Sequence, residues 1–226
     1  MSARDHVLTS IRRSLGVTGR EAPRRKAVAD RIAGHPRGVV PARGRGTAKE
    51  RIALFARMVG AASGSVERIS VSTDVPAAVA TFLRRHNVPL SVRRGDDAML
   101  AALPWEQAGT LEVTTGMSDG KQLASVSHAL AGVAETGTLV LTSGRNNPTT
   151  LNFLPDNHIV VVEAKDIVGD YETVWQRLRE RFGTRNLPRT VNMITGPSRS
   201  ADIEQTLILG AHGPRRLHVI IVGEVE

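Results

Sequence analysis

Hydrophobic and polar positions alternate along the chain with two periods, and each period predicts one class of element. The first helix is predicted over residues 4–15, where apolar side chains share one face at Val7, Leu8, Ile11 and Leu15. Gly16 follows as a helix stop. A second helix is predicted from Ala48 to Gly60, because Thr47 and Glu50 have the spacing of a capping box.

Strand and helix patterns alternate from residue 65 onward. Short apolar or β-branched runs predict strands at 65–72, 88–92, 111–114, 128–134, 138–142, 158–163, 191–194 and 217–222. Two amphipathic helices lie among them. One is capped by Asp74 and buries Val79, Phe82 and Leu83, and the other, at 170–182, buries Val174, Trp175, Leu178 and Phe182. This alternation predicts a three-layer α/β fold with a mostly parallel sheet.

Basic charge is confined to the start of the chain. The 226 residues hold 30 Lys and Arg against 22 Asp and Glu, a net charge of +8, and residues 1–46 account for the whole excess. Residues 17–46 are rich in Gly, Pro and Arg, so we expect a flexible basic arm. The predicted organisation is a helix and arm at 1–46 followed by an α/β domain at 47–226. No aromatic residue lies among the arginines of 1–46, which disfavours nucleic-acid binding.

Composition excludes several classes of chemistry. The chain has no cysteine, so it supplies neither a thiolate nucleophile nor thiolate ligands for zinc or iron–sulfur clusters. Its seven histidines lack the HxH and HExxH spacings, so no metal site is predicted. No apolar stretch approaches about 18 residues, and the first residues lack the apolar core of a secretory signal. We therefore expect a cytoplasmic protein without a membrane span.

Three segments hold residues suited to chemistry. In the first, Glu135 follows an apolar run and precedes Thr136, Gly137 and Thr138. Glu135 is a candidate nucleophile or general base, and the alternative is a carboxylate that accepts hydrogen bonds from backbone N–H groups. In another of these segments, His212 lies between glycines, with Gly213 and Arg215 close by. His212 is a candidate catalytic residue or a structural turn residue.

The remaining segment, residues 194–204, is expected to bind an anion. A strand leads into a Gly-Pro-Ser turn and a predicted helix start, with candidate ligand-binding residues at Thr195, Gly196, Ser198, Arg199, Ser200 and Asp202. Free N–H groups, hydroxyls and a guanidinium at a helix start form an anion or phosphate cradle. The alternative is a capped helix. Because ligands bind beyond the carboxyl ends of parallel strands, we expect Glu135, Ser198 and His212 to meet at one end of the sheet.

Four segments resemble the lactate utilization protein C family, which has a LUD domain: AETGTLVL (134–141), LPDNHIVVV (154–162), ITGPSRSADIE (194–204) and LGAHGPRRLHV (209–219). The resemblance implies a NagB/RpiA/CoA-transferase-like fold. It also implies oxidation of L-lactate to pyruvate together with partner proteins that carry iron–sulfur clusters. One position departs from the family pattern: Leu130 stands where relatives often have an Asp.

Three hypotheses for function follow. The first is an accessory subunit of an L-lactate utilization system that binds a small anionic ligand. The second is a stand-alone CoA-transferase-like or other acyl- or phosphate-ligand enzyme that uses Glu135. The third, an ATP-dependent folate ligase-like activity, ranks last because the chain has no glycine-rich nucleotide loop. Whether the chain is itself catalytic is left open by its sequence.

Overall fold

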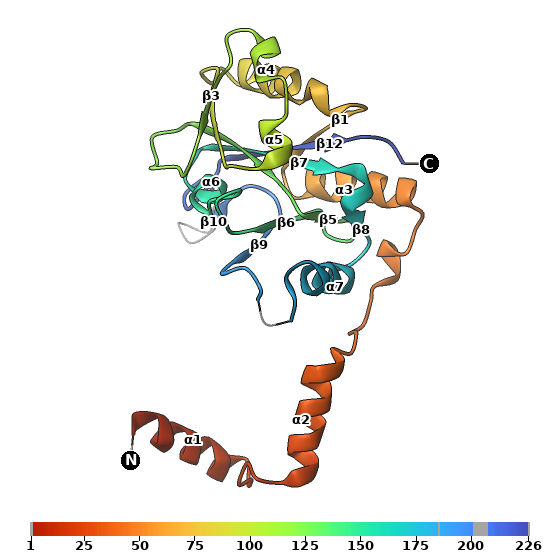
Figure 1. Ribbon diagram of the computed structural model, residues 1–226, viewed down its shortest axis with the longest axis vertical. Coiled ribbons are helices and arrows are strands. Elements are labelled where there is room, and N and C mark those ends of the chain that lie inside the picture. The colour runs from red at the N-terminus through yellow and green to blue at the C-terminus, as the bar shows by residue number, and fades with distance from the viewer. Residues whose placement is uncertain (1, 185, 201–207, 226) are drawn as a thin grey trace. The chain divides into compact units, whose positions relative to one another are not determined.

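The computed structural model describes residues 2–184, 186–200 and 208–225 (Figure 1). The chain divides into two compact units, Met1–Val39 and Val40–Glu226. Unit 2 holds the α/β domain. No helix in the described ranges is long and apolar enough to cross a lipid bilayer.

Unit 1 consists of two helices, α1 (Ala3–Ser14) and α2 (Ala22–Gly34). Helix α1 lies where the sequence predicted it, and Ser2 and Asp5 form its capping box. Helix α2 lies inside the stretch predicted to be an irregular arm. Alanine, arginine and lysine are strong helix formers, and Lys26 pairs with Asp30 one turn later at 2.6 Å. These local preferences favour a helix, although the Gly and Pro content predicted an irregular segment here.

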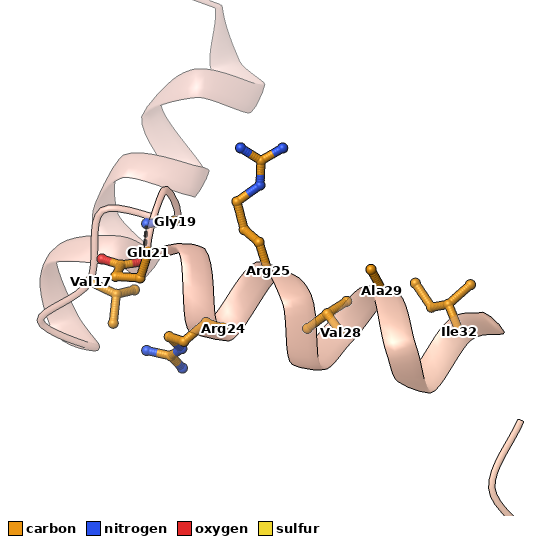
Figure 2. Close-up of a pocket in the computed structure, with 8 residues that line it drawn as sticks. All are labelled: Val17, Gly19, Glu21, Arg24, Arg25, Val28, Ala29 and Ile32. Atoms are coloured by element: carbon orange, nitrogen blue, oxygen red, sulfur yellow. Dashed lines mark hydrogen bonds between the residues drawn. The ribbon is translucent and has the colours of Figure 1, made fainter. Parts of the chain in front are cut away.

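Neither helix of unit 1 buries a side chain. Val28 and Ile32 are 57% and 67% exposed, and Figure 2 shows them along α2. With Val17 and Arg24 they line an open hollow of about 420 Å³. The two helices of unit 1 therefore form no hydrophobic core among the described residues.

The domain is built on a six-stranded sheet with the strand order β1-β12-β7-β4-β2-β3. Every neighbouring pair in this sheet is parallel. The strands are β1 (Ser65–Ile69), β2 (Ser91–Arg94), β3 (Glu112–Thr115), β4 (Ala124–His128), β7 (Asn157–Glu163) and β12 (Arg216–Val222). The predicted α/β fold with a mostly parallel sheet is confirmed.

Each face of this sheet has its own hydrophobic cluster. Ile159 and Val161 of β7 pack with α4 (Val75–Arg85) on one face. Val160 and Val162 pack on the other face with α3 (Ala48–Ala61). Because side chains alternate along a strand, His158 lies on the α3 face, beside Val160.

A second, smaller sheet covers the rest of the α3 face, with the order β8-β5-β6-β9. Strands β5 and β6 form an antiparallel hairpin, and β6 also pairs antiparallel with β9. Helix α7 packs on the outer side of this sheet, as Figure 1 shows. These elements are β5 (Ala131–Val133), β6 (Thr138–Thr142), β8 (Ile167–Val168), β9 (Val191–Ile194) and α7 (Tyr171–Phe182).

The remaining elements are short. They are the helices α5 (Ala98–Ala101) and α6 (Thr150–Phe153), the strands β10 (Arg199–Ser200) and β11 (Ile208–Leu209), and 3₁₀ helices at Ala42–Gly44, Ser72–Asp74, Trp105–Ala108 and Ala164–Asp166.

Several further details differ from the sequence prediction, among them the strand expected at 88–92, which is β2 at Ser91–Arg94. Strand β4 was missed, and the predicted strand at 128–134 is the shorter β5. Asp74 precedes α4, but its side chain makes no capping hydrogen bond. Trp175 is exposed on α7, whereas Val174 and Leu178 are buried as predicted.

Two glycines let the turns of the small sheet approach α3. Gly137, in the β5–β6 turn, has φ +69°, and a Cβ atom there would lie 2.5 Å from the backbone nitrogen of Val59. Gly196, after β9, has φ +75°, and a Cβ atom there would collide with the carbonyl oxygen of Ala62. Both turns therefore pack on the carboxyl end of α3, and only glycine fits at either contact.

A third close approach joins residues 42–44 to the domain. Cβ atoms built on Gly44 and Gly169 would each collide with the carbonyl oxygen of the other residue. Residues 40–46 thus belong with the domain, and the boundary between the units falls at Val39 and Val40 rather than at the predicted 46/47.

Replacement of Gly137 by Ala is expected to destabilise the domain by at least about 2 kcal/mol, since it adds a positive-φ penalty to a backbone clash. For a chain of this size the melting temperature should fall by roughly 4–8 °C. Gly60, inside α3, is the matched control, because a Cβ atom added there would meet nothing within 4 Å. Gly60→Ala should leave the melting temperature unchanged or raise it. Equal effects of the two substitutions would contradict the packing described.

Limited trypsin digestion should cut unit 1 first, at sites such as Arg20 and Arg25, because its helices bury nothing. Arg43 and Arg45 flank the buried Gly44, so they should resist cleavage. Mass spectrometry should find a stable product that begins before Val40. Cleavage after Arg43 at the same early time would show that residues 40–46 are not held by the domain.

Candidate functional site

A cavity of about 280 Å³ lies on the α3 face of the main sheet. It borders the amino-terminal ends of β7 and β12, the end of β9, and helix α6. Its lining residues are Asn152, Phe153, His158, Met193, Ile194, Gly196, Pro197, Ser198, Arg199, His212, Gly213, Pro214 and Leu217. Two of the three segments chosen from the sequence therefore meet here, but beside the amino ends of parallel strands rather than their carboxyl ends.

His158 is fully buried beside this cavity. Its side chain is 0% exposed, and its Nε2 atom lies 3.0 Å from the hydroxyl oxygen of Ser127 on β4. Burial lowers the pKa of His158 to about 3. The imidazole is therefore neutral near pH 7, and its Nδ1 atom has no hydrogen-bond partner in the described part of the chain.

Asn152 is the second buried polar residue at the cavity. Its side chain is 1% exposed, and its Oδ1 atom accepts a hydrogen bond of 3.2 Å from Ser127 Oγ. Its Nδ2 atom is buried without a partner among the described residues. Ser127 thus joins His158 and Asn152, and each of the two keeps one unpaired polar atom.

Ser198 and His212 form the opposite rim. The Ser198 amide donates to the carbonyl of Pro214 at 2.9 Å, and the Ser198 carbonyl accepts from the amide of Gly210 at 2.9 Å. The backbone N–H of His212 donates to Ser198 Oγ at 3.4 Å. Gly213 packs directly on Ser198, where a Cβ would lie 3.2 Å from the serine Cβ. The segments 196–200 and 209–215 therefore hold each other in place.

The predicted helix start at this rim is wrong for Arg199 and Ser200. These residues form strand β10, which pairs antiparallel with β11. The backbone bonds of Ser198 to Gly210 and Pro214 hold this segment extended, which excludes a helical turn there. No helix N-terminus at Ser198 or Ser200 thus contributes to an anion cradle. Asp202 lies outside the described residues.

Glu135 does not line the cavity. Its side chain is 4% exposed in the β5–β6 turn, and its amide donates to the carbonyl of Gly169 at 3.2 Å. Its Oε2 atom has no hydrogen-bond partner in the described ranges, so the expected backbone N–H donors do not reach that oxygen. A nucleophile must reach its substrate, and the burial of Glu135 argues against that role.

The turn of Glu135 and the end of β9 meet through threonine hydroxyls. Thr138 Oγ1 lies 2.6 Å from Thr195 Oγ1 and 2.7 Å from the hydroxyl of Tyr171, and Thr136 Oγ1 lies 2.7 Å from Thr138 Oγ1. The two segments converge because β6 and β9 pair antiparallel, not because they end parallel strands of one sheet. Thr136, Thr138 and Thr195 thus connect the turn to β9 without lining the cavity.

The other candidate residues pack against other parts of the domain. Gly137 and Gly196 pack on α3, and Gly196 also borders the cavity. Arg215 lines a separate groove with Phe82 and His86. Leu130 packs against the cluster between the small sheet and α7.

Sequence reasoning missed Ser127, Asn152 and His158. The available signal was His158 at the start of an otherwise apolar strand, HIVVVE, where a buried polar side chain needs partners. Ser127 and Asn152 carry no comparable signal, because Ser and Asn are common in loops and turns.

The charged side chains at the cavity are few. None of the described residues that line it is acidic, and Arg199 contributes a guanidinium from its exposed rim. In the part of the chain that the structure describes, no group of three His, Asp or Glu residues is arranged to hold a metal ion.

Comparison with known families agrees with the motifs. Residues 120–222 match the family model described as the LUD domain. This part of the chain is therefore similar to the LUD domain. All the residues that line the cavity lie within it. A DUF162 family protein from Deinococcus radiodurans has a solved structure with a TM-score of 0.56, covering 78% of this chain and 99% of that one. At 23% identity, that likeness shows the fold alone.

Curated relatives match part of the chain. A protein named Lactate utilization protein C from Geobacillus sp. (strain WCH70) is 40% identical over 91 residues, which is 40% of this chain and 38% of the relative. A protein of the same name from Anoxybacillus flavithermus is 37% identical over 90 residues, 40% of this chain and 39% of the relative. An uncharacterized protein of Neisseria meningitidis is 35% identical over 99 residues, 44% of this chain and 42% of the relative. The matched segment spans about two fifths of each of these relatives.

Stability of the α/β domain should fall as the pH is lowered below about 6.5. Unfolded His158 binds a proton near pH 6.5, whereas folded His158 does so only near pH 3. The unfolded state therefore binds more protons between these values, and by pH 5 the loss from His158 is about 2 kcal/mol. Urea unfolding at pH 7 and pH 5 measures this loss in the free energy of unfolding.

The variant His158→Gln removes this titration while keeping a polar side chain. Its free energy of unfolding should change less between pH 7 and pH 5 than that of the wild type, by about 2 kcal/mol. His218, whose pKa burial lowers to about 4, supplies a residual pH dependence in both proteins. An unchanged difference between the two pH values would show that His158 is not held neutral in the fold.

Proposed function

We propose that this protein is an accessory subunit of an L-lactate utilization system and that it binds a small organic anion in the cavity beside His158. The observation that carries the proposal is the match at 34–40% identity to several proteins named Lactate utilization protein C. The position of the cavity supports it, since its lining residues all lie within residues 120–222, which match the LUD-domain model.

The proposal includes partners. Oxidation of L-lactate to pyruvate releases two electrons, which need an acceptor. This chain has no cysteine to ligate an iron–sulfur cluster, so in the proposal the clusters belong to partner proteins of a cytoplasmic complex. The basic arm of unit 1 would then favour an acidic surface on such a partner.

The geometry gives the enzyme alternative less support. A CoA-transferase-like reaction needs the Glu135 carboxylate to attack an acyl-CoA, but this side chain is buried in a turn and lies outside the cavity. Fold kinship alone is a weak argument for that chemistry. The role of an accessory subunit makes no such demand on Glu135.

Deletion of the gene in its own organism tests the proposal. The deletion strain should fail to grow on L-lactate as the sole carbon source, should grow normally on glucose, and should recover on lactate when the wild-type gene is restored. A tagged copy purified from lactate-grown cells should retain proteins that contain iron and acid-labile sulfide. Normal growth of the deletion strain on L-lactate would refute the proposed function.

A further inference from the structure

A second hollow, of about 770 Å³, lies at the amino-terminal ends of β1 and β12. Helix α4 contributes Phe82 and His86 to its wall, and the segment that enters β12 contributes Arg215 and Arg216. We call it the basic groove. It shares only Leu217 with the cavity described above, and none of the described residues that line it is acidic.

Neutral neighbours position the two arginines of the basic groove. The stem of Arg215 packs on Gly210, where a Cβ atom would collide with Cγ of the arginine. Arg216 donates from Nη1 to Oδ1 of Asn157 at 3.3 Å. Because side chains alternate along a strand, Arg216 lies on the α4 face of β12 together with His218. Neither Gly210 nor Asn157 carries a charge, so both guanidinium charges remain uncompensated by these contacts.

The ring of Phe82 packs between two imidazoles. Its centroid lies 4.6 Å from that of His86 and 4.4 Å from that of His218, which stacks on it. His218 has polar neighbours of its own, since Ser65 Oγ lies 2.8 Å from its Nδ1 atom and Glu67 Oε2 lies 3.5 Å from its Nε2 atom. The imidazole of His86 has no hydrogen-bond or ion-pair partner in the described ranges. His86 is thus the imidazole that can still pair with a ligand.

The positive charges at the basic groove act on one another. Partial burial, the charge of Arg216 and the charge of Arg85 together lower the pKa of His86. In the described part of the chain, the carboxylate that pairs with this group of charges is that of Glu67, and it faces His218 rather than the arginines. Crowded like charges cost free energy, and a bound anion would recover it.

Only part of this charge has a structural explanation. Arg84 and Arg85 lie in the last turn of α4, where positive charge interacts favourably with the helix dipole. Arg215 and Arg216 belong to a different segment, which leads into a strand, and the dipole of α4 does not account for them. Their convergence on the end of α4 therefore points to a negatively charged ligand.

We propose that the basic groove binds a small dianion, a phosphate ester or a dicarboxylate, between Arg215, Arg216 and His86. Two permanent guanidinium charges match two negative charges, and a guanidinium can donate two parallel hydrogen bonds to either kind of group. The volume of the groove lies within the usual range for small-molecule sites, so the body of such a ligand also fits. Ile208 and Leu209 line the same groove and offer apolar contact to that body.

Calorimetric titration of the full chain with phenyl phosphate, succinate and propionate tests the inference. At pH 7 the first two carry close to two negative charges, whereas propionate carries one. We expect at least one dianion to bind at least about ten-fold more tightly than propionate, since it gains a further charge-assisted contact. Preference for phenyl phosphate would assign a phosphate ester, and preference for succinate a dicarboxylate. Similar affinities for all three, or no binding, would overturn the inference.

Arg215→Gln tests whether the dianion binds in the basic groove. Arg215 makes no ion pair or side-chain hydrogen bond among the described residues, so the melting temperature should stay near that of the wild type. Affinity for the preferred dianion should fall by at least about ten-fold. Arg84→Gln is the matched control, because it removes the same charge from the end of α4 but does not line the groove.

The control variant should bind the dianion within about two-fold of the wild type, as an exposed charge outside the site contributes little. Equal weakening in the two variants would assign the effect to net charge and overturn the proposed site. Unchanged affinity in Arg215→Gln would overturn it too.

The imidazole of His86 gives a second, local readout. A negative charge beside it should raise the pKa of His86 toward its ordinary value of about 6.5. NMR spectra of the histidine rings over a range of pH, with and without the dianion, measure this change, and His86→Gln identifies the resonance. An unchanged pKa of His86 in the complex would place the dianion elsewhere and refute the site.

This site goes beyond the proposed function, and the two are tested separately. Failure of both dianions to bind would refute the site and leave the accessory-subunit role unaffected. Normal growth of the deletion strain on L-lactate would refute that role and leave the dianion site unaffected.

Discussion

The packing of Gly137 and Gly196 against the last turn of α3 sets the position of the small sheet on the large one. Each glycine has a positive φ and lies where a Cβ atom would collide with backbone, so the two turns approach α3 as closely as main chain allows. Hydroxyl contacts from Thr138 to Thr195 and Tyr171 then join the turns to each other. The cavity lies beside this arrangement, because the chain from Gly196 continues directly into its rim at Ser198.

The location of the cavity explains the unusual character of its walls. On the α3 face of the main sheet, β7 is otherwise apolar, with Val160 and Val162. His158 and Ser127 interrupt that apolar surface, and burying them costs free energy unless their polar atoms are paired. The described protein groups satisfy only part of the network. A partly satisfied polar network of this kind costs free energy in a folded core.

The two units differ in what stabilises them. The domain places separate hydrophobic clusters on the two faces of a parallel sheet and a third between the small sheet and α7. Unit 1 relies on helix caps and an exposed ion pair between Lys26 and Asp30, which contribute little in water. Its apolar side chains, such as Val28 and Ile32, therefore remain exposed, whereas those of the domain are buried in its three clusters.

The sequence by itself determined the parallel α/β class, the capped helix predicted at 48–60 and the LUD resemblance, because periodicity, caps and motifs are local patterns. It also selected Ser198, Arg199, His212 and Gly213, which do meet at one cavity. Only the tertiary structure decided that Glu135 is buried elsewhere and that β4 is a central strand. It also decided that Ser127, Asn152 and His158, from three separate elements, share one network. Such long-range pairing depends on how the sheets pack, and no local pattern records it.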